Sequence, residues 1–249
     1  MSSGGGDKMQ TILESTKLSV KSSQKELLHH IDIELTAGET VVLLGPNGAG
    51  KSTFVKSIAG ISELKTTGKI LFGGQNIARL PAEARAKLGI FLSYQEPVEI
   101  AGVTYSEMLR TALEERGKKI SLRDFKLQLA SDLERLGLEP FACERDLNVG
   151  FSGGEKKKME VLQMLVLEPK LAMFDEIDSG LDVDALKKIA EILTDYQQRT
   201  KATYLFITHN LRLAKYLPVR KVYVMNAGSI EKVGGSELLD EVNKKGFAK

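Results

Sequence analysis

A glycine-rich turn that follows a short apolar run limits the possible folds of this chain more than any other part of its sequence. Val41–Leu44 is continuously apolar, as expected of a strand buried on both faces of a parallel sheet. Lys51–Ala59, ended by Gly60, has the pattern of a helix. The turn between them fits G-x-x-x-x-G-K-S/T with the residues Gly45, Pro46, Asn47, Gly48, Ala49, Gly50, Lys51 and Ser52. A strand, this turn and a helix in that order predict a phosphate-binding loop.

Each part of this loop has a physical role in holding a triphosphate. The glycines let backbone N–H groups turn inward around an anion, and the helix that begins at Lys51 points its positive end at the phosphates. We expect the Lys51 ammonium to reach the β- and γ-phosphates and the Ser52 hydroxyl to ligate Mg²⁺, with Thr53 beside them. The loop therefore predicts ATP and Mg²⁺ as the bound ligands.

Two carboxylates follow a second apolar run later in the chain. Asp175 and Glu176 come directly after Leu171–Phe174. We expect Asp175 to hold Mg²⁺, through water, and Glu176 to polarise the attacking water. Alone this pattern is weak, because strands often end in acidic turns. After a phosphate-binding loop it indicates nucleotide hydrolysis.

Strands and helices alternate along the rest of the chain, which predicts an α/β fold. Residues 11–37 indicate two or three strands, with period-2 alternation in the second half that is typical of an antiparallel strand. Further expected strands and helices are Ile70–Phe72, Ile90–Tyr94, two helices from about Thr104 to Leu138 broken near Gly117, a helix from Gly154 to Glu168, and Leu171–Phe174, Asp182–Arg199 and Thr203–Thr208. This order predicts a mostly parallel sheet with crossover helices and with ligands at the carboxyl ends of its strands.

Composition excludes several classes of protein. The chain has 249 residues, enough for one full α/β core, and a net charge of +2 from 35 Lys+Arg and 33 Asp+Glu. So small a net charge argues against bulk electrostatic binding of nucleic acid or of anionic membranes. No apolar run approaches the roughly 20 residues of a membrane span. Residues 1–10 are expected to be a flexible tail, and the single cysteine, Cys143, suits the cytoplasm or, after removal of a transit segment, an organelle stroma.

A second glycine-rich loop carries a family resemblance. Phe151-Ser152-Gly153-Gly154-Glu155 precedes a helix, with Ser152 as its N-cap and two glycines whose amides can meet an anion. The loop resembles the signature loop of ABC ATPases, with Phe151 where Leu is usual and Glu155 where Gln is usual. The resemblance implies that these residues contact the γ-phosphate of an ATP held by a second copy. It therefore implies a transient, ATP-dependent, head-to-tail homodimer.

Other residues match this family in order and spacing. Gln95 lies at the position of the family's glutamine that contacts Mg²⁺ and the water, Ser179-Gly180-Leu181-Asp182 resembles the loop that crosses to the opposite site, and His209 matches the histidine that contacts the γ-phosphate. The resemblance implies a P-loop NTPase core with an antiparallel β subdomain and an inserted helical subdomain. Over 11–249, it places the core at about 11–95 and 150–249 and the helical subdomain at about 96–149.

Within the superfamily the chain most resembles the SufC family, the ATPase subunits of SUF iron–sulfur cluster assembly. The resemblance is carried by Pro97–Val103, Val149–Lys157, Leu162–Met164, Leu167–Pro169 and, most strongly, Asp175–Asp182. Transporter subunits usually have Pro-Thr or Pro-Ser where this chain has Ile177-Asp178. The resemblance implies soluble scaffold partners like SufB and SufD, docked near Gln95 to about Met108. A cluster needs about four thiolates, so the cluster chemistry is expected to belong to these partners.

Alternatives remain at this stage. The core motifs fit the nucleotide-binding subunit of a membrane ABC transporter equally well. A soluble ABC ATPase acting on nucleic acid or ribosomes is disfavoured by the length and by the near-neutral charge. A binding module without turnover is disfavoured by the presence of Lys51, Glu176 and His209. ABC ATPases usually stack adenine on an N-terminal aromatic residue, but none precedes Phe54, so we expect aliphatic or polar contacts near Val20 to Gln24 and weak base selectivity.

Overall fold

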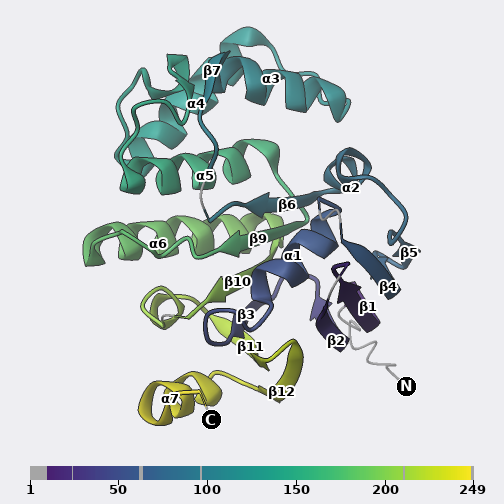
Figure 1. Cartoon of the computed structure of the whole chain (residues 1–249). Coiled ribbons are helices and arrows are strands. Elements are labelled where there is room, and N and C mark those ends of the chain that lie inside the picture. Colours follow the sequence, from purple (N-terminus) through teal and green to yellow (C-terminus); the bar gives the residue numbers. More distant parts are fainter. Residues whose placement is uncertain (1–9, 24, 62–63, 96, 210, 248–249) are drawn as a thin grey trace, which may run out of the picture.

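The computed structural model describes residues 10–23, 25–61, 64–95, 97–209 and 211–247 (Figure 1). The tail expected over 1–10 therefore falls outside the described residues, apart from Gln10. Within these ranges no helix combines the length and the apolar character that crossing a membrane requires.

A six-stranded sheet lies at the centre of the molecule. Its order is β12-β11-β3-β10-β9-β6, and only β12 runs antiparallel to its neighbour. Every residue of β3, β9 and β10 is buried, as expected of strands covered on both faces. The predicted mostly parallel sheet is thus confirmed. Its strands are β3 (Thr40–Leu44), β6 (Ile90–Ser93), β9 (Leu171–Asp175), β10 (Thr203–Thr208), β11 (Val219–Asn226) and β12 (Ser229–Gly234).

The carboxyl ends of four adjacent parallel strands meet at one edge of this sheet. In the strand register, Leu44 at the end of β3 pairs with Thr208 of β10, and Ser93 at the end of β6 pairs with Phe174 of β9. The phosphate loop and the segments that begin with Gln95, Glu176 and His209 all follow these ends. The sheet therefore gathers residues that are up to 164 positions apart in the sequence, counting from Gly45 to His209.

An antiparallel sheet covers one face, on the right in Figure 1. Its order is β2-β1-β4-β5, formed by β1 (Thr11–Lys21), β2 (Glu26–Thr36), β4 (Lys65–Phe72) and β5 (Gln75–Asn76). Helix α1 (Lys51–Ala59) buries Phe54, Val55 and Ile58 in a core shared by both sheets. Helix α2 (Ala82–Leu88) is tied to α1 by Arg85, whose Nη1 donates to the carbonyl oxygens of Ser57 and Ile58 at 2.6 and 2.9 Å.

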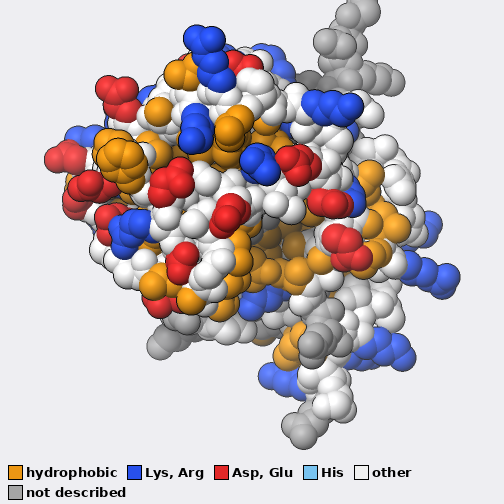
Figure 2. All heavy atoms as spheres, turned by 90° about the horizontal axis from the view of Figure 1, so that it is seen from above, with side chains coloured by type: hydrophobic (Ala, Val, Ile, Leu, Met, Phe, Trp, Pro, Cys, Tyr) orange, Lys and Arg blue, Asp and Glu red, His pale blue; other side chains and the backbone are white. Residues whose placement is uncertain are grey.

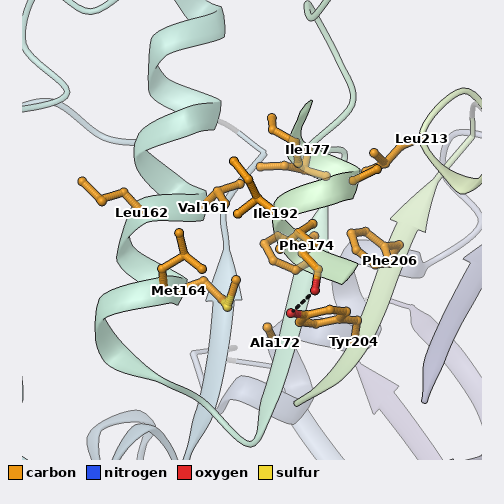
Figure 3. Packing of buried hydrophobic residues seen from close by; sticks show 14 of the residues in the cluster. Val161, Leu162, Met164, Ala172, Phe174, Ile177, Ile192, Tyr204, Phe206 and Leu213 are labelled. Carbon is orange, nitrogen blue, oxygen red and sulfur yellow. Dashed lines mark hydrogen bonds between the residues drawn. The ribbon is translucent and has the colours of Figure 1, made fainter. Parts of the chain in front are cut away.

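Helices α5 (Gly153–Leu167) and α6 (Val183–Thr200) cover the opposite face (Figure 3). Val161 and Met164 of α5 and Ile192 of α6 gather around Phe174 of β9. The rings of Phe174 and Phe206 stack with centroids 5.0 Å apart. The Tyr204 hydroxyl donates to the carbonyl oxygen of Leu193 at 3.0 Å, which satisfies the polar end of a fully buried side chain.

Helices α3 (Tyr105–Glu115) and α4 (Leu122–Leu136) form a further layer above α5 in Figure 1. Thr104 and Glu107 make a reciprocal capping box at the start of α3, and Gly137 ends α4 with a left-handed cap. Both helices and their break near Gly117 match the sequence-based expectation. The segments that it left without an assignment are α2, β5, β7 (Ile100–Thr104), β8 (Asp146–Leu147), β11, β12 and α7 (Glu237–Lys245).

Candidate functional site

The phosphate loop leaves β3 and enters α1 as the sequence predicts. Gly50, the N-cap of α1, has a φ of 104°, which an L side chain rarely adopts. A Cβ at Gly45 would collide with the carbonyl oxygen of Met225 on β11. The loop is pinned at its other end by the Gly228 N–H, which donates to the carbonyl oxygen of Ala49 at 2.9 Å. Glycine is therefore required at two positions of the motif for reasons that lie in the surrounding structure.

Lys51 is a buried cation at the start of α1. Its ammonium donates to the carbonyl oxygens of Gly45 and Pro46 at 2.7 and 2.9 Å. Burial lowers the pKa of Lys51, and the negative charges of Glu176 and Asp175 oppose this shift. A phosphate beside the loop would compensate the buried charge, so the site favours an anionic ligand.

Asp175, at the end of β9, has one buried carboxylate oxygen whose hydrogen bonding is not satisfied within the described residues. Burial raises the pKa of Asp175, and a hydrogen bond from Ser52 opposes the shift. Among the described residues, its Oδ1 is buried and has no hydrogen-bond partner. A cation with its bound water would satisfy this oxygen, and the Ser52 hydroxyl supplies a second oxygen ligand of the kind that Mg²⁺ prefers. The residues present therefore fit Mg²⁺.

The Glu176 carboxylate is held between two side chains from neighbouring strand ends. Gln95 Nε2 donates to Glu176 Oε2 at 2.7 Å, and His209 Nδ1 lies 2.8 Å from Glu176 Oε1. The backbone of Glu176 has a φ of 56°, a left-handed conformation that is strained for this residue type. Its N–H donates to the carbonyl oxygen of Ile207 at 2.9 Å, which holds this conformation. Two segments that are far from Glu176 in the sequence, at Gln95 and at Ile207 to His209, thus fix its position.

A cavity of about 340 Å³ lies between the phosphate loop and the side chains of Gln95 and Glu176. Leu27, the loop residues 47–53, Gln95 and Glu176 line it. Leu27, at the second position of β2, was not anticipated from the sequence. The expectation of adenine contacts near Val20 to Gln24 stays a prediction; Val20 itself is fully buried in β1, and Gln24 lies outside the described residues. Leu27 supplies an aliphatic part of the cavity lining beside the phosphate loop.

The signature loop lies apart from this cavity. Ser152 caps α5, with its hydroxyl donating to Glu155 Oε2 at 2.7 Å and its N–H donating to the same oxygen at 2.8 Å. Hydrogen bonds from the Ser152 backbone and side chain lower the pKa of Glu155. Phe151 anchors the loop, because its ring packs edge-on against Tyr105 and lies 3.8 Å under the guanidinium of Arg145. None of Ser152, Gly153, Gly154 or Glu155 lines the cavity within one copy of the chain.

The segment after Glu176 links this residue to α6. The Ser179 hydroxyl donates to the carbonyl oxygen of Glu176 at 2.9 Å, and Asp182 caps α6 by accepting from the Ala185 N–H at 2.7 Å. Asp182, like the signature loop, does not line the cavity. One copy of the chain therefore brings together the phosphate loop, Gln95, Glu176 and His209, but not the residues expected to act across a dimer.

Comparisons with known proteins agree with this geometry. Residues 28–179 match the protein family described as "ABC transporter". A probable ABC transporter ATP-binding protein of Streptococcus pyogenes serotype M3 is 43% identical over 243 residues, which cover 96% of this chain and 94% of that protein. A probable ATP-dependent transporter of Synechocystis is 41% identical over 244 residues, covering 96% and 95% of the two chains.

Solved structures show the same fold. The ATP-binding subunit of an ABC transporter superimposes with a TM-score of 0.79 at 28% identity and covers 96% of each chain. A dimeric ATP-binding cassette with bound ADP and phosphate also gives 0.79, covering 90% of this chain and 98% of that one, and at 18% identity it shows the fold alone. The chain belongs to the ABC transporter family, as an ATP-binding domain that hydrolyses ATP with Mg²⁺.

Proposed function

We propose that this chain is the ATPase subunit of an iron–sulfur cluster assembly complex of the SufC type. The observation that carries the proposal is the environment of Asp178, at the position where the sequence departs from transporter subunits. Asp178 is 4% exposed, and the Thr208 hydroxyl lies 3.2 Å from each of its carboxylate oxygens. Burial raises the pKa of Asp178. Asp178 is therefore a buried side chain that is hydrogen-bonded to Thr208, directly before His209, and not an exposed residue that could vary freely.

Each residue at the strand ends has a role in this proposal. Lys51 and the loop amides bind the phosphates, and Glu176 polarises the attacking water. Gln95 and His209 orient the Glu176 carboxylate through the two short contacts described above. Because its backbone and both oxygens are already fixed, Glu176 loses little freedom when water binds, which favours reaction.

Mg²⁺ belongs at the same edge of the sheet. Ser52, Asp175 through water, and the side-chain oxygen of Gln95 would hold it, since the Gln95 nitrogen is used on Glu176. When bound, the ion neutralises charge on the β- and γ-phosphates.

The residues that lie off the cavity are proposed to complete the cavity of a second copy. Ser152, Gly153, Gly154 and Glu155 would face the γ-phosphate held by the partner, and Asp182 would cross beside it. ATP must favour the closed dimer by roughly 5.5 kcal/mol to shift it from mostly open to mostly closed. Several charge-assisted hydrogen bonds, at about 1.5–3 kcal/mol each, suffice for this.

A groove beside Gln95 is the proposed docking site of the scaffold. It has a volume of about 500 Å³ and lies between α2, β6 and α3, with Phe91, Leu92 and Tyr94 among its mainly apolar lining. The upper face of the molecule is hollowed, and hydrophobic side chains lie in the hollow (Figure 2). Val98, in the segment that follows, is 72% exposed. We propose that a scaffold pair of the SufB and SufD type docks here, over the edge of a helical subdomain at about 96–149 inserted between core segments at about 11–95 and 150–249.

Affinity purification of the tagged chain from its own cells, followed by mass spectrometry, tests the partner. Recovery of two related proteins without membrane spans would support the scaffold proposal. Recovery of a polytopic membrane protein would refute it and leave the ATPase assignment intact.

The second candidate function is that of a nucleotide-binding subunit of a membrane transporter. It is favoured by the description of the matched family and by the names of the similar proteins from Streptococcus pyogenes and Synechocystis. The same purification separates the two candidates.

A further inference from the structure

Two buried ionisable side chains on α5 have no part in the chemistry described so far. Lys157 and Glu160 are three positions apart on this helix, and they are only 5% exposed each. Charged side chains are rarely this buried unless they have defined partners. Their partners show what the pair does.

Both side chains bind the backbone of the segment that leads from β6 to Gln95. Lys157 Nζ donates to the carbonyl oxygen of Gln95 at 2.9 Å and lies 3.5 Å from that of Tyr94. Glu160 Oε2 accepts from the N–H of Tyr94 at 3.3 Å, while Glu160 Oε1 accepts from Gln163 at 3.2 Å. Helix α5 thus binds the backbone of two consecutive residues, at the N–H of Tyr94 through Glu160 and at the carbonyl oxygens of Tyr94 and Gln95 through Lys157.

This backbone segment sets the position of the Gln95 side chain. The side chain of Gln95 is exposed and reaches Glu176 through its 2.7 Å hydrogen bond. Its place depends on where the backbone of Tyr94 and Gln95 is held. The same helix begins one turn earlier with the signature residues Ser152–Gly154. A shift of α5 would therefore move Gln95 relative to Glu176.

We propose that Lys157 and Glu160 are positioning residues, which hold Gln95 on the catalytic carboxylate and couple it to the position of the signature helix in the same subunit. The proposal rests on the ATPase site proposed above and not on the identity of the partner. It predicts that loss of the backbone contacts of either Lys157 or Glu160 slows turnover and leaves nucleotide binding by the phosphate loop unchanged.

Steady-state ATPase measurements on the full chain test this with two pairs of variants. Lys157→Met removes the hydrogen bonds to the backbone carbonyls, and Glu160→Leu removes the hydrogen bond from the Tyr94 N–H. Lys157→Arg keeps a donor, and Glu160→Gln keeps an acceptor. We expect the first two to lower kcat by about 10- to 100-fold, because a displacement of about 1 Å in a reacting site has an effect of this size. We expect KM for ATP within about twofold of the parent, and Lys157→Arg and Glu160→Gln within about threefold in kcat.

Two controls make the result specific. Lys158→Met removes a lysine of the same helix that donates to the carbonyl oxygen of Gly137 at the surface, and this variant should turn over like the parent. Glu176→Gln should lose turnover, and a Glu176→Gln variant with full turnover would overturn the site assignment itself. Hydrogen exchange adds a structural readout, since the Tyr94 amide should exchange faster in Glu160→Leu.

Unchanged kcat in Lys157→Met and Glu160→Leu, beside an inactive Glu176→Gln, would overturn the proposal. A raised KM at unchanged kcat would also overturn it, because the pair would then serve binding. If Glu160→Leu does not fold, the comparison of Lys157→Met with Lys157→Arg decides alone, and equal loss in both would count against positioning.

Discussion

Replacing Glu160 with Gln should change how the stability of the protein depends on pH. Burial raises the pKa of Glu160 from 4.5 to about 7, and the charge of Lys157 and the hydrogen bond from Gln163 only partly oppose this. A raised pKa means that the folded state binds the proton more tightly than the unfolded state does. The stability that this gives is fully present below the unfolded pKa of 4.5 and is lost as the pH rises through 7. Gln has no charge to gain, so its variant escapes this loss.

The size of the effect follows from the shift. A change from 4.5 to about 7 corresponds to about 3 kcal/mol in all, of which about 2.5 kcal/mol falls between pH 5 and pH 8. The free energy of unfolding of Glu160→Gln, minus that of the parent, should therefore rise by about 2.5 kcal/mol over this range. Urea unfolding at pH 5, 6, 7 and 8, followed by circular dichroism, measures the difference.

The matched control is Glu107→Gln, at the exposed capping box of α3. Hydrogen bonds from Thr104 lower the pKa of Glu107, so it is mostly ionised in both states above pH 5. The difference from the parent should then be constant between pH 5 and pH 8. A constant difference for Glu160→Gln as well would refute the claim that Glu160 is held against its own ionisation.

Glu176→Gln should accumulate an ATP-dependent dimer that elutes earlier in size-exclusion chromatography, and an unchanged elution volume with bound ATP would contradict the proposed composite site. Gly45→Ala should lower the melting temperature by several degrees, because its Cβ meets the Met225 carbonyl, whereas Gly153→Ala has open space and should melt like the parent. The parent should hydrolyse ATP and GTP with similar kcat/KM, because Leu27 offers only aliphatic contact to the base. Leu27→Tyr should tighten the binding of both nucleotides by adding a stacking surface. A strict ATP preference in the parent would contradict this reasoning.

Local signals explain which elements could be predicted from the sequence. The phosphate loop and α1 were predicted with the bounds that the structure has. Gly50 at the start of α1 and Gly60 at its end both have left-handed backbone conformations, which few other residues adopt. Helix α2 was not found, since it is seven residues long and is held by bonds from Arg85 to distant carbonyls. Strand β11 depends on pairing with β3, nearly 180 residues earlier, and no local pattern reports that pairing.

The site was predictable to the same depth. Gln95, Glu176 and His209 could be expected at one edge, because each follows a strand of a parallel sheet. That Gln95 and His209 would each take one oxygen of the same carboxylate depends on side-chain geometry that spacing does not contain. The pair on α5 was missed because Lys and Glu on a helix are usually solvated. The one available signal was that Glu160 stands inside the apolar run around Met159 and Val161.

The proposed docking groove and the hydrogen bonds that hold the backbone before Gln95 meet at Tyr94, which gives a last prediction. Tyr94 lines the groove, and its N–H is held by Glu160, one residue before Gln95. A scaffold seated in the groove would therefore touch the segment that positions the side chain bonded to Glu176. We expect the isolated chain to hydrolyse ATP slowly as a monomer, and the scaffold to raise kcat. Glu160→Leu should lose this stimulation while it still binds the scaffold, which co-purification checks. Equal turnover of the parent with and without its scaffold would show that binding in the groove does not affect the Glu176 carboxylate.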